Sequence, residues 1–134
     1  MYNYKLTKVV FEEGSQLSSI DYSFWDCPNL TSLELPKGLT SIESWSIGLC
    51  PKLTTLICHA ETAPYANSSF NFYQISYDMT IYVPEESIAS YKAEEPWNRY
   101  RIIGMRKNNF IGEGNQTSSY LPLHLNYYTS YSQQ

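Results

Sequence analysis

Short apolar segments recur along this chain at a nearly fixed spacing. Corresponding positions of two consecutive units lie 22 or 23 residues apart, and both units carry a Cys-Pro dipeptide. The matching positions are Leu17, Ile20, Phe24, Cys27, Leu30, Leu33 and Leu35 in the first unit, and Leu39, Ile42, Ile47, Cys50, Leu53, Leu56 and Cys58 in the second. A period of this length predicts stacked repeats in which every unit adopts the same local structure.

Each unit contains a segment typical of a β-strand. The alternation of residues 33–35 predicts a strand with one buried face, and residues 56–58 and 81–83 occupy the same place in later units. Pro36 and Pro84 lack a backbone donor, which ends the ladder. Residues 39–42 predict a second small strand in each unit. Between the strands, one large apolar side chain from each unit would stack on those of the neighbouring units inside the coil. The expected members of this column are Phe24, Ile47 and Phe70. We count three to four strand-bearing units, close to the minimum for a continuous core.

These motifs resemble the leucine-rich repeats of the BspA-like type, which occur in surface proteins of gut and oral bacteria. The resemblance covers about residues 6–106 and rests on the Leu-x-x-Ile start, the aromatic position, the Cys followed by Leu, and the Leu-x-Leu-Pro strand. It implies a mainly β repeat solenoid, a short right-handed leucine-rich-repeat coil with small parallel sheets and one C-terminal capping helix. Ser46-Ile47 departs from the usual Ala-Phe.

We expect a repeat domain over residues 1–106, with its C-terminal cap at about 84–106. The stretch 84–96 has an acidic start suited to a helix N-terminus and a terminating Pro96. Ile88 and Tyr91 are predicted to face the last coil, and Trp97 to fold over its end. Residues 107–134 form a polar, Tyr-rich tail, for which we expect either disorder or docking on an exposed sheet edge.

Composition narrows the possible partners. The chain has 134 residues and a formal charge of −4, from 9 Lys+Arg and 13 Asp+Glu, which disfavours nucleic-acid binding. No apolar run is long enough to span a membrane. Three cysteines without a CxxC pair, and two distant histidines, predict neither a disulfide scaffold nor a metal site. We therefore expect no cofactor.

The residues with reactive side chains fit structural roles better than catalytic ones. Cys27 and Cys50 share one repeat position, so we expect buried thiols stacked on each other. Cys58 and His59 could suggest a nucleophile and its base, as in a small hydrolase. Because neighbours on a strand point to opposite faces, we expect this pair to be separated.

A candidate partner-binding surface lies on the face of the predicted sheet that points away from the buried leucines. If the leucines point inward, one outward column contains Val10, Glu34, Ile57 and Tyr82, and Lys8, Ser32, Thr55 and Thr80 form the column beside it. A flat apolar-aromatic strip with few charges is a typical contact surface of repeat proteins. The simpler interpretation is that these residues merely favour strands.

The sequence thus predicts a non-enzymatic module for protein–protein recognition or cell-surface adhesion, with a protein partner on a host or bacterial surface. A structural spacer in a larger surface protein is the alternative, and a small hydrolase is disfavoured. The resemblance implies a cell-surface or extracellular location. The first residues lack the apolar core of a signal peptide, so we expect either a cytoplasmic protein or a piece of a longer exported precursor. The oligomeric state stays open.

Overall fold

Short strands recur along the chain with the period that the sequence predicts. The computed structural model describes residues 3–67, 71–108 and 119–122. Its strands are β1 (Lys8–Val9), β2 (Ser19–Ile20), β3 (Phe24–Trp25), β4 (Ser32–Leu35), β5 (Ser41–Ile42), β6 (Ile47–Gly48), β7 (Thr55–Cys58), β8 (Tyr65–Ala66), β9 (Thr80–Pro84), β10 (Arg101–Asn108) and β11 (Ser119–Pro122).

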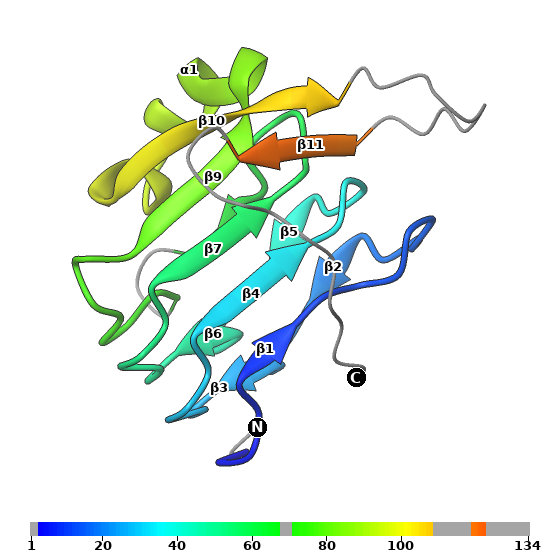
Figure 1. The fold of residues 1–134 in the computed structure, drawn as a ribbon. Coiled ribbons are helices and arrows are strands. Elements are labelled where there is room, and N and C mark those ends of the chain that lie inside the picture. Colours follow the sequence, from blue (N-terminus) through cyan, green and yellow to red (C-terminus); the bar gives the residue numbers. More distant parts are fainter. Residues whose placement is uncertain (1–2, 68–70, 109–118, 123–134) are drawn as a thin grey trace.

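The described strands form three sheets (Figure 1). The six-stranded sheet has the order β1-β4-β7-β9-β10-β11, the three-stranded sheet β2-β5-β8, and the two-stranded sheet β3-β6. From β1 to β8 the chain enters these sheets in the same sequence on every pass, and all pairs are parallel except β10 with β11. The predicted repeat fold with small parallel sheets is confirmed, whereas the right-handed turn of the coil stays a prediction.

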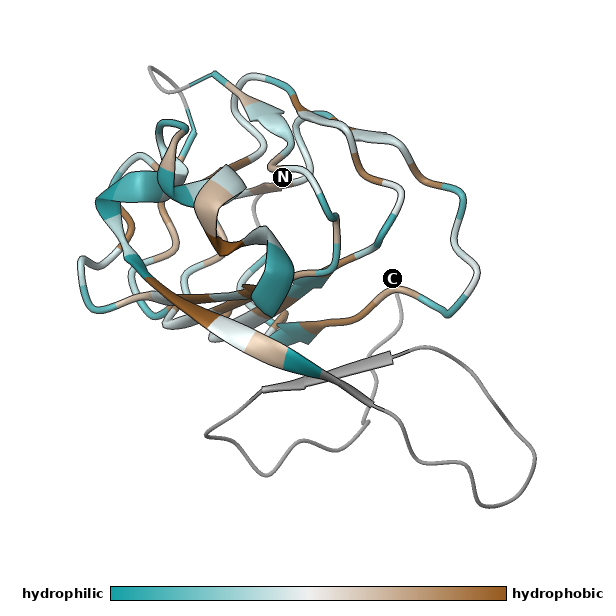
Figure 2. Ribbon diagram, turned by 90° about the horizontal axis from the view of Figure 1, so that it is seen from above, coloured by the Kyte–Doolittle hydropathy of each residue, from teal (hydrophilic) through white to brown (hydrophobic). Residues whose placement is uncertain are grey.

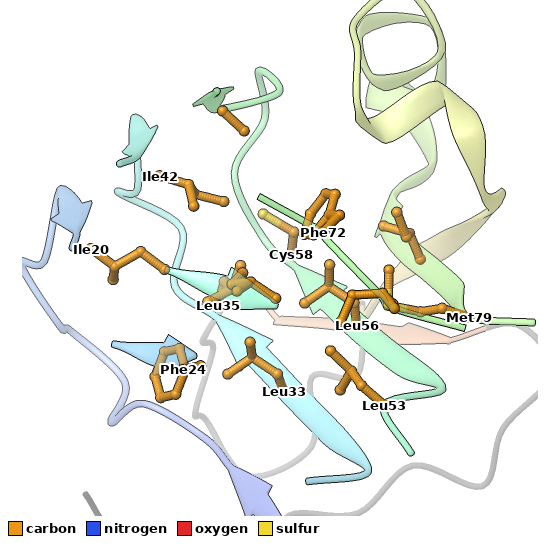
Figure 3. Close-up of a cluster of buried hydrophobic side chains, with 14 of the residues drawn as sticks. Ile20, Phe24, Leu33, Leu35, Ile42, Leu53, Leu56, Cys58, Phe72 and Met79 are labelled. Carbon is orange, nitrogen blue, oxygen red and sulfur yellow. The ribbon is translucent and has the colours of Figure 1, made fainter. Parts of the chain in front are cut away.

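The apolar residues of successive units meet between the sheets. Figure 3 shows Leu33, Leu35, Leu56 and Ile42 pointing into this shared interior, and all four are fully buried. Figure 2 looks down on the molecule, where both β10 and the helix beside it carry hydrophobic as well as hydrophilic residues. The stacking follows from the register, in which Leu33 pairs with Leu56 and Leu56 with Ile81.

In the third unit, a different residue from the predicted one continues the column of large apolar side chains. Phe24 pairs with Ile47 as predicted. Phe70 lies outside the described residues. Beside Ile47 the structure places Phe72, whose N–H donates to the Ile47 carbonyl at 2.7 Å. Phe72 follows Ile47 by 25 positions rather than 23, because the third unit is longer.

One buried asparagine supports this column. Asn71 is 1% exposed, and its Oδ1 accepts the N–H groups of Ser46 and Ile47 at 3.0 and 3.1 Å. Its Nδ2 donates to the carbonyls of Ile42 and Glu43 at 3.2 and 2.9 Å. The side chain therefore pairs backbone groups that would otherwise be buried without partners.

The C-terminal cap begins as predicted but is less regular. A 3₁₀ turn, η1 (Glu85–Ser87), leads into α1 (Ile88–Lys92), and a second turn, η2 (Trp97–Arg99), precedes β10. The expectation that Pro96 ends the helix is wrong, because α1 already ends at Lys92. The helix packs at the β9 and β10 end of the stack (Figure 1).

Two aromatic residues hold this cap on the last coil, as expected. Tyr91 is fully buried, and its hydroxyl donates to the Ala60 carbonyl at 2.6 Å. Trp97 is also fully buried, and its indole N–H donates to the Pro64 carbonyl at 2.9 Å. Their rings meet edge to face, 5.0 Å apart. Each ring thus buries its apolar body and satisfies its polar atom, which is what a stable cap requires.

The chain continues as a strand past residue 106, the predicted end of the repeat domain. β10 runs to Asn108, and β11 pairs with it antiparallel, Met105 lying opposite Pro122. Residues 109–118 and 123–134 of the expected tail lie outside the described residues, so the boundary at 106 and the character of the tail stay predictions. Within the described part, no helix combines the length and apolar character needed to cross a bilayer.

Candidate partner-binding surface

The strand register aligns the predicted surface residues in two columns across the six-stranded sheet. Lys8 pairs with Ser32, Ser32 with Thr55, and Thr55 with Thr80, and Arg101 continues this polar column on β10. In the second column Glu34 pairs with Ile57, Ile57 with Tyr82, and Tyr82 with Ile103. Both columns point away from the main core, because side chains alternate along a strand. We call this side of the sheet the outer face.

The apolar middle of the second column is not an open strip. Ile57 and Tyr82, which we expected to be exposed, are only 4% and 7% exposed. Together with Met105 they form a small hydrophobic group separate from the main core, against which Ile103 packs. The expectation fails because it did not include β10, which brings two further apolar side chains to this face.

A histidine and a glutamate are in contact beside this apolar group. The Nε2 atom of His59 is 2.6 Å from a carboxylate oxygen of Glu34, and the two side chains are 20% and 14% exposed. Both face outward, because Glu34 pairs with Ile57 and His59 follows Ile57 by two residues. Sequence reasoning missed this contact, although register and the two-residue period of a strand would have indicated it.

The polar column stays accessible. Lys8, Ser32, Thr55 and Thr80 are half-buried, and Arg101 is exposed. Val10, the first member of the other column, is half-buried one residue after β1. Of the predicted contact residues, the column of hydroxyls with a basic residue at each end is therefore the part most open to a partner.

The thiols that we expected to stack, those of Cys27 and Cys50, lie in the main core and not on the outer face. Cys27 and Cys50 are both fully buried. The Cys50 thiol is 3.2 Å from the carbonyls of Phe24 and Gly48. A hydrogen bond with Cys27 raises the pKa of Cys50, and burial adds to this effect. The pair fits the small, apolar role that we expected.

The adjacent Cys58 and His59 are separated, as predicted. Cys58 belongs to the main core, whereas His59 contacts Glu34 on the outer face. Burial raises the pKa of the Cys58 thiol to about 11, and the Tyr91 hydroxyl lies 3.3 Å from its sulfur. A protonated, inaccessible thiol is a poor nucleophile. Among the described residues, no three His, Cys, Asp or Glu side chains are placed to hold a metal ion.

Comparison with protein-family models identifies the repeat. The model of the BspA type leucine-rich repeat region, in six copies, matches residues 1–119. Comparisons with curated proteins and with solved structures give no match. The match covers most of the 134 residues, and leucine-rich repeats of this type indicate a protein-interaction or surface module. On the repeat spacing, the parallel register and this match, the chain belongs to the BspA-type leucine-rich repeat family.

Proposed function

We propose that the chain is a non-enzymatic module that recognises a protein on a host or bacterial cell surface through the outer face of its six-stranded sheet. The residues that we assign to this contact are Val10, Glu34, Ile57, Tyr82, Lys8, Thr55 and Thr80. The observation that supports the proposal is the alignment of both columns across neighbouring parallel strands. Short stacked strands hold such a face rigidly, which lowers the entropic cost of binding.

The members of this surface have two roles. The polar column and Glu34 would contact the partner directly, because their side chains reach solvent. Ile57 and Tyr82 would support the face from within the small apolar group. An aspartate at either of these two positions is therefore expected to destabilise the fold itself, since it would bury a carboxylate.

The experiment replaces both Thr55 and Thr80 by arginine in the full chain. Immobilised extracellular-matrix and bacterial envelope proteins serve as the partners. Two long cations in the middle of the column would clash with a bound surface, so retention should fall by 10-fold or more if about 1.4 kcal/mol is lost. The matched control is Ser18→Arg, at an exposed position outside the six-stranded sheet. Retention and melting temperature of this control should equal those of the unchanged chain.

Two results would contradict the proposal. If none of these proteins is retained by the unchanged chain, the spacer interpretation is favoured instead. If the chain shows enzymatic turnover that disappears in Cys58→Ala or His59→Ala, the non-enzymatic assignment is wrong.

A further inference from the structure

A hollow lined by tyrosines lies away from the outer face, where the two-stranded sheet approaches the C-terminal cap. Its volume is about 410 Å³, within the range of small-molecule sites. Tyr73 joins it from the strand side, where it forms a parallel bridge with Gly48 of β6. Arg99 and Tyr100 join it from η2 and the residue that follows. We call this hollow the tyrosine pocket.

The floor of the tyrosine pocket is held in place by buried contacts. Asn71 makes the four backbone hydrogen bonds described above, and Phe72 is 4% exposed. The Phe72 ring meets the rings of Trp97 and Tyr100 edge to face, at 5.4 and 5.7 Å. The Tyr100 hydroxyl lies 3.5 Å from the Phe72 carbonyl. A floor fixed in this way is organised before a ligand arrives.

The rim combines exposed rings with hydrogen-bonding groups. Tyr73 and Tyr77 are 51% and 86% exposed, so both rings are open to a ligand. The other polar groups in the lining include the Gln74 amide and the Arg99 guanidinium. Such rings offer an apolar face and a polar edge to the same ligand.

The charge of the rim is nearly balanced. One guanidinium nitrogen of Arg99 lies 2.9 Å from a carboxylate oxygen of Glu95, one turn away on the cap. The guanidinium has further N–H donors for a ligand hydroxyl. The neighbouring carboxylate removes the net positive charge that an acidic ligand would require.

We propose that the tyrosine pocket binds a pyranose unit of an uncharged oligosaccharide. The C–H face of a pyranose ring is apolar and stacks on a tyrosine ring, while its hydroxyls pair with amide, guanidinium and phenol groups. The pocket supplies both kinds of contact without a net charge. This activity is separate from protein recognition at the outer face, and neither proposal depends on the other.

The experiment titrates the full chain with neutral hexasaccharides built from glucose, mannose, galactose or N-acetylglucosamine, and with hexagalacturonate as the acidic comparison. Calorimetry measures affinity. Tryptophan fluorescence provides a second signal, because the ring of Trp25, one of the three tryptophans, lies nearly parallel to that of Tyr73, at 9° and 6.2 Å. We expect at least one neutral sugar to bind, and hexagalacturonate to bind more weakly.

Single alanine variants then locate the site. Tyr77→Ala should lower the affinity about 3- to 10-fold, the value of one aromatic contact. Because Tyr77 is 86% exposed, we expect the substitution to leave folding unchanged, and a melting curve checks this. The matched control is Tyr65→Ala, because Tyr65 is 64% exposed but outside the pocket lining; its affinity should be unchanged. The proposal is overturned if no neutral sugar binds, if only the acidic one does, or if both variants lose affinity equally.

Discussion

At Gly48 a single added methyl group would collide with a neighbouring aromatic ring. A Cβ atom there would lie 2.2, 2.7 and 2.8 Å from three carbons of the Trp25 ring, closer than real Cβ atoms approach any neighbour. Gly48 does not have a positive φ, so its backbone accepts alanine. The clash is therefore with one side chain, and we expect Gly48→Ala to displace the Trp25 ring.

The cost can be worked from the contacts that this ring makes. Trp25 meets Trp45 edge to face at 4.9 Å and lies parallel to Tyr73 at 6.2 Å. Each aromatic pair contributes about 0.5–1.5 kcal/mol beyond the area it buries, so losing both lowers the free energy of unfolding by about 1–3 kcal/mol. Where no ring is in the way, alanine in place of glycine is expected to stabilise by about 0.4–1 kcal/mol.

A double-mutant cycle separates these two effects. Urea unfolding followed by far-UV circular dichroism measures the unchanged chain, Gly48→Ala, Trp25→Ala and the double variant. We expect Gly48→Ala to destabilise the unchanged chain but to be neutral or stabilising when Trp25 is alanine, with a coupling energy of about 2 kcal/mol. Equal effects of Gly48→Ala in both backgrounds would refute the reasoning.

Three further predictions concern the core and the cap. Asn71→Ala removes four hydrogen bonds to buried backbone and should cost about 3–5 kcal/mol in urea unfolding; a loss below about 1 kcal/mol would contradict this. Gly104→Ala would place a Cβ atom 2.9 Å from the Cα atom of Glu85, so we expect a loss of about 1–3 kcal/mol on thermal unfolding. Gly38→Ala, where the nearest atom is 3.6 Å away, should not show this loss, and equal losses would contradict the steric explanation. Burial raises the pKa of the Cys58 thiol from 9.0 to about 11, so the protonated thiol stabilises the fold fully below pH 9, and the free energy of unfolding should fall by about 2 kcal/mol as the pH rises to 11. Unfolding at several pH values measures this, and an equal decline in Cys58→Ala would contradict it.

Periodicity along the chain was sufficient to predict which strands stack. The spacing of Phe24 and Ile47, or of Leu33 and Leu56, equals one turn of the coil, and the structure pairs both. Alternation along a strand then predicted that Cys58 and His59 point to opposite sides. Such features are local or recur at nearly the same spacing in consecutive units, so a single sequence contains them.

Exposure of the outer face, in contrast, was decided by tertiary structure. Nothing near Ile57 or Tyr82 in the sequence indicates that Met105 will pack with them, because that contact depends on β10 pairing with β9. The tyrosine pocket likewise combines Tyr73 and Tyr77 with Arg99, which the fold of the cap brings together.

The sequence by itself therefore determined the repeat, the strand register and the inward-facing core of this protein. Only the tertiary structure decided which outward side chains are covered and which form a pocket. The physical reason is that burial depends on every segment that comes near a residue in space, whereas the register of the first two units follows from the spacing that they share.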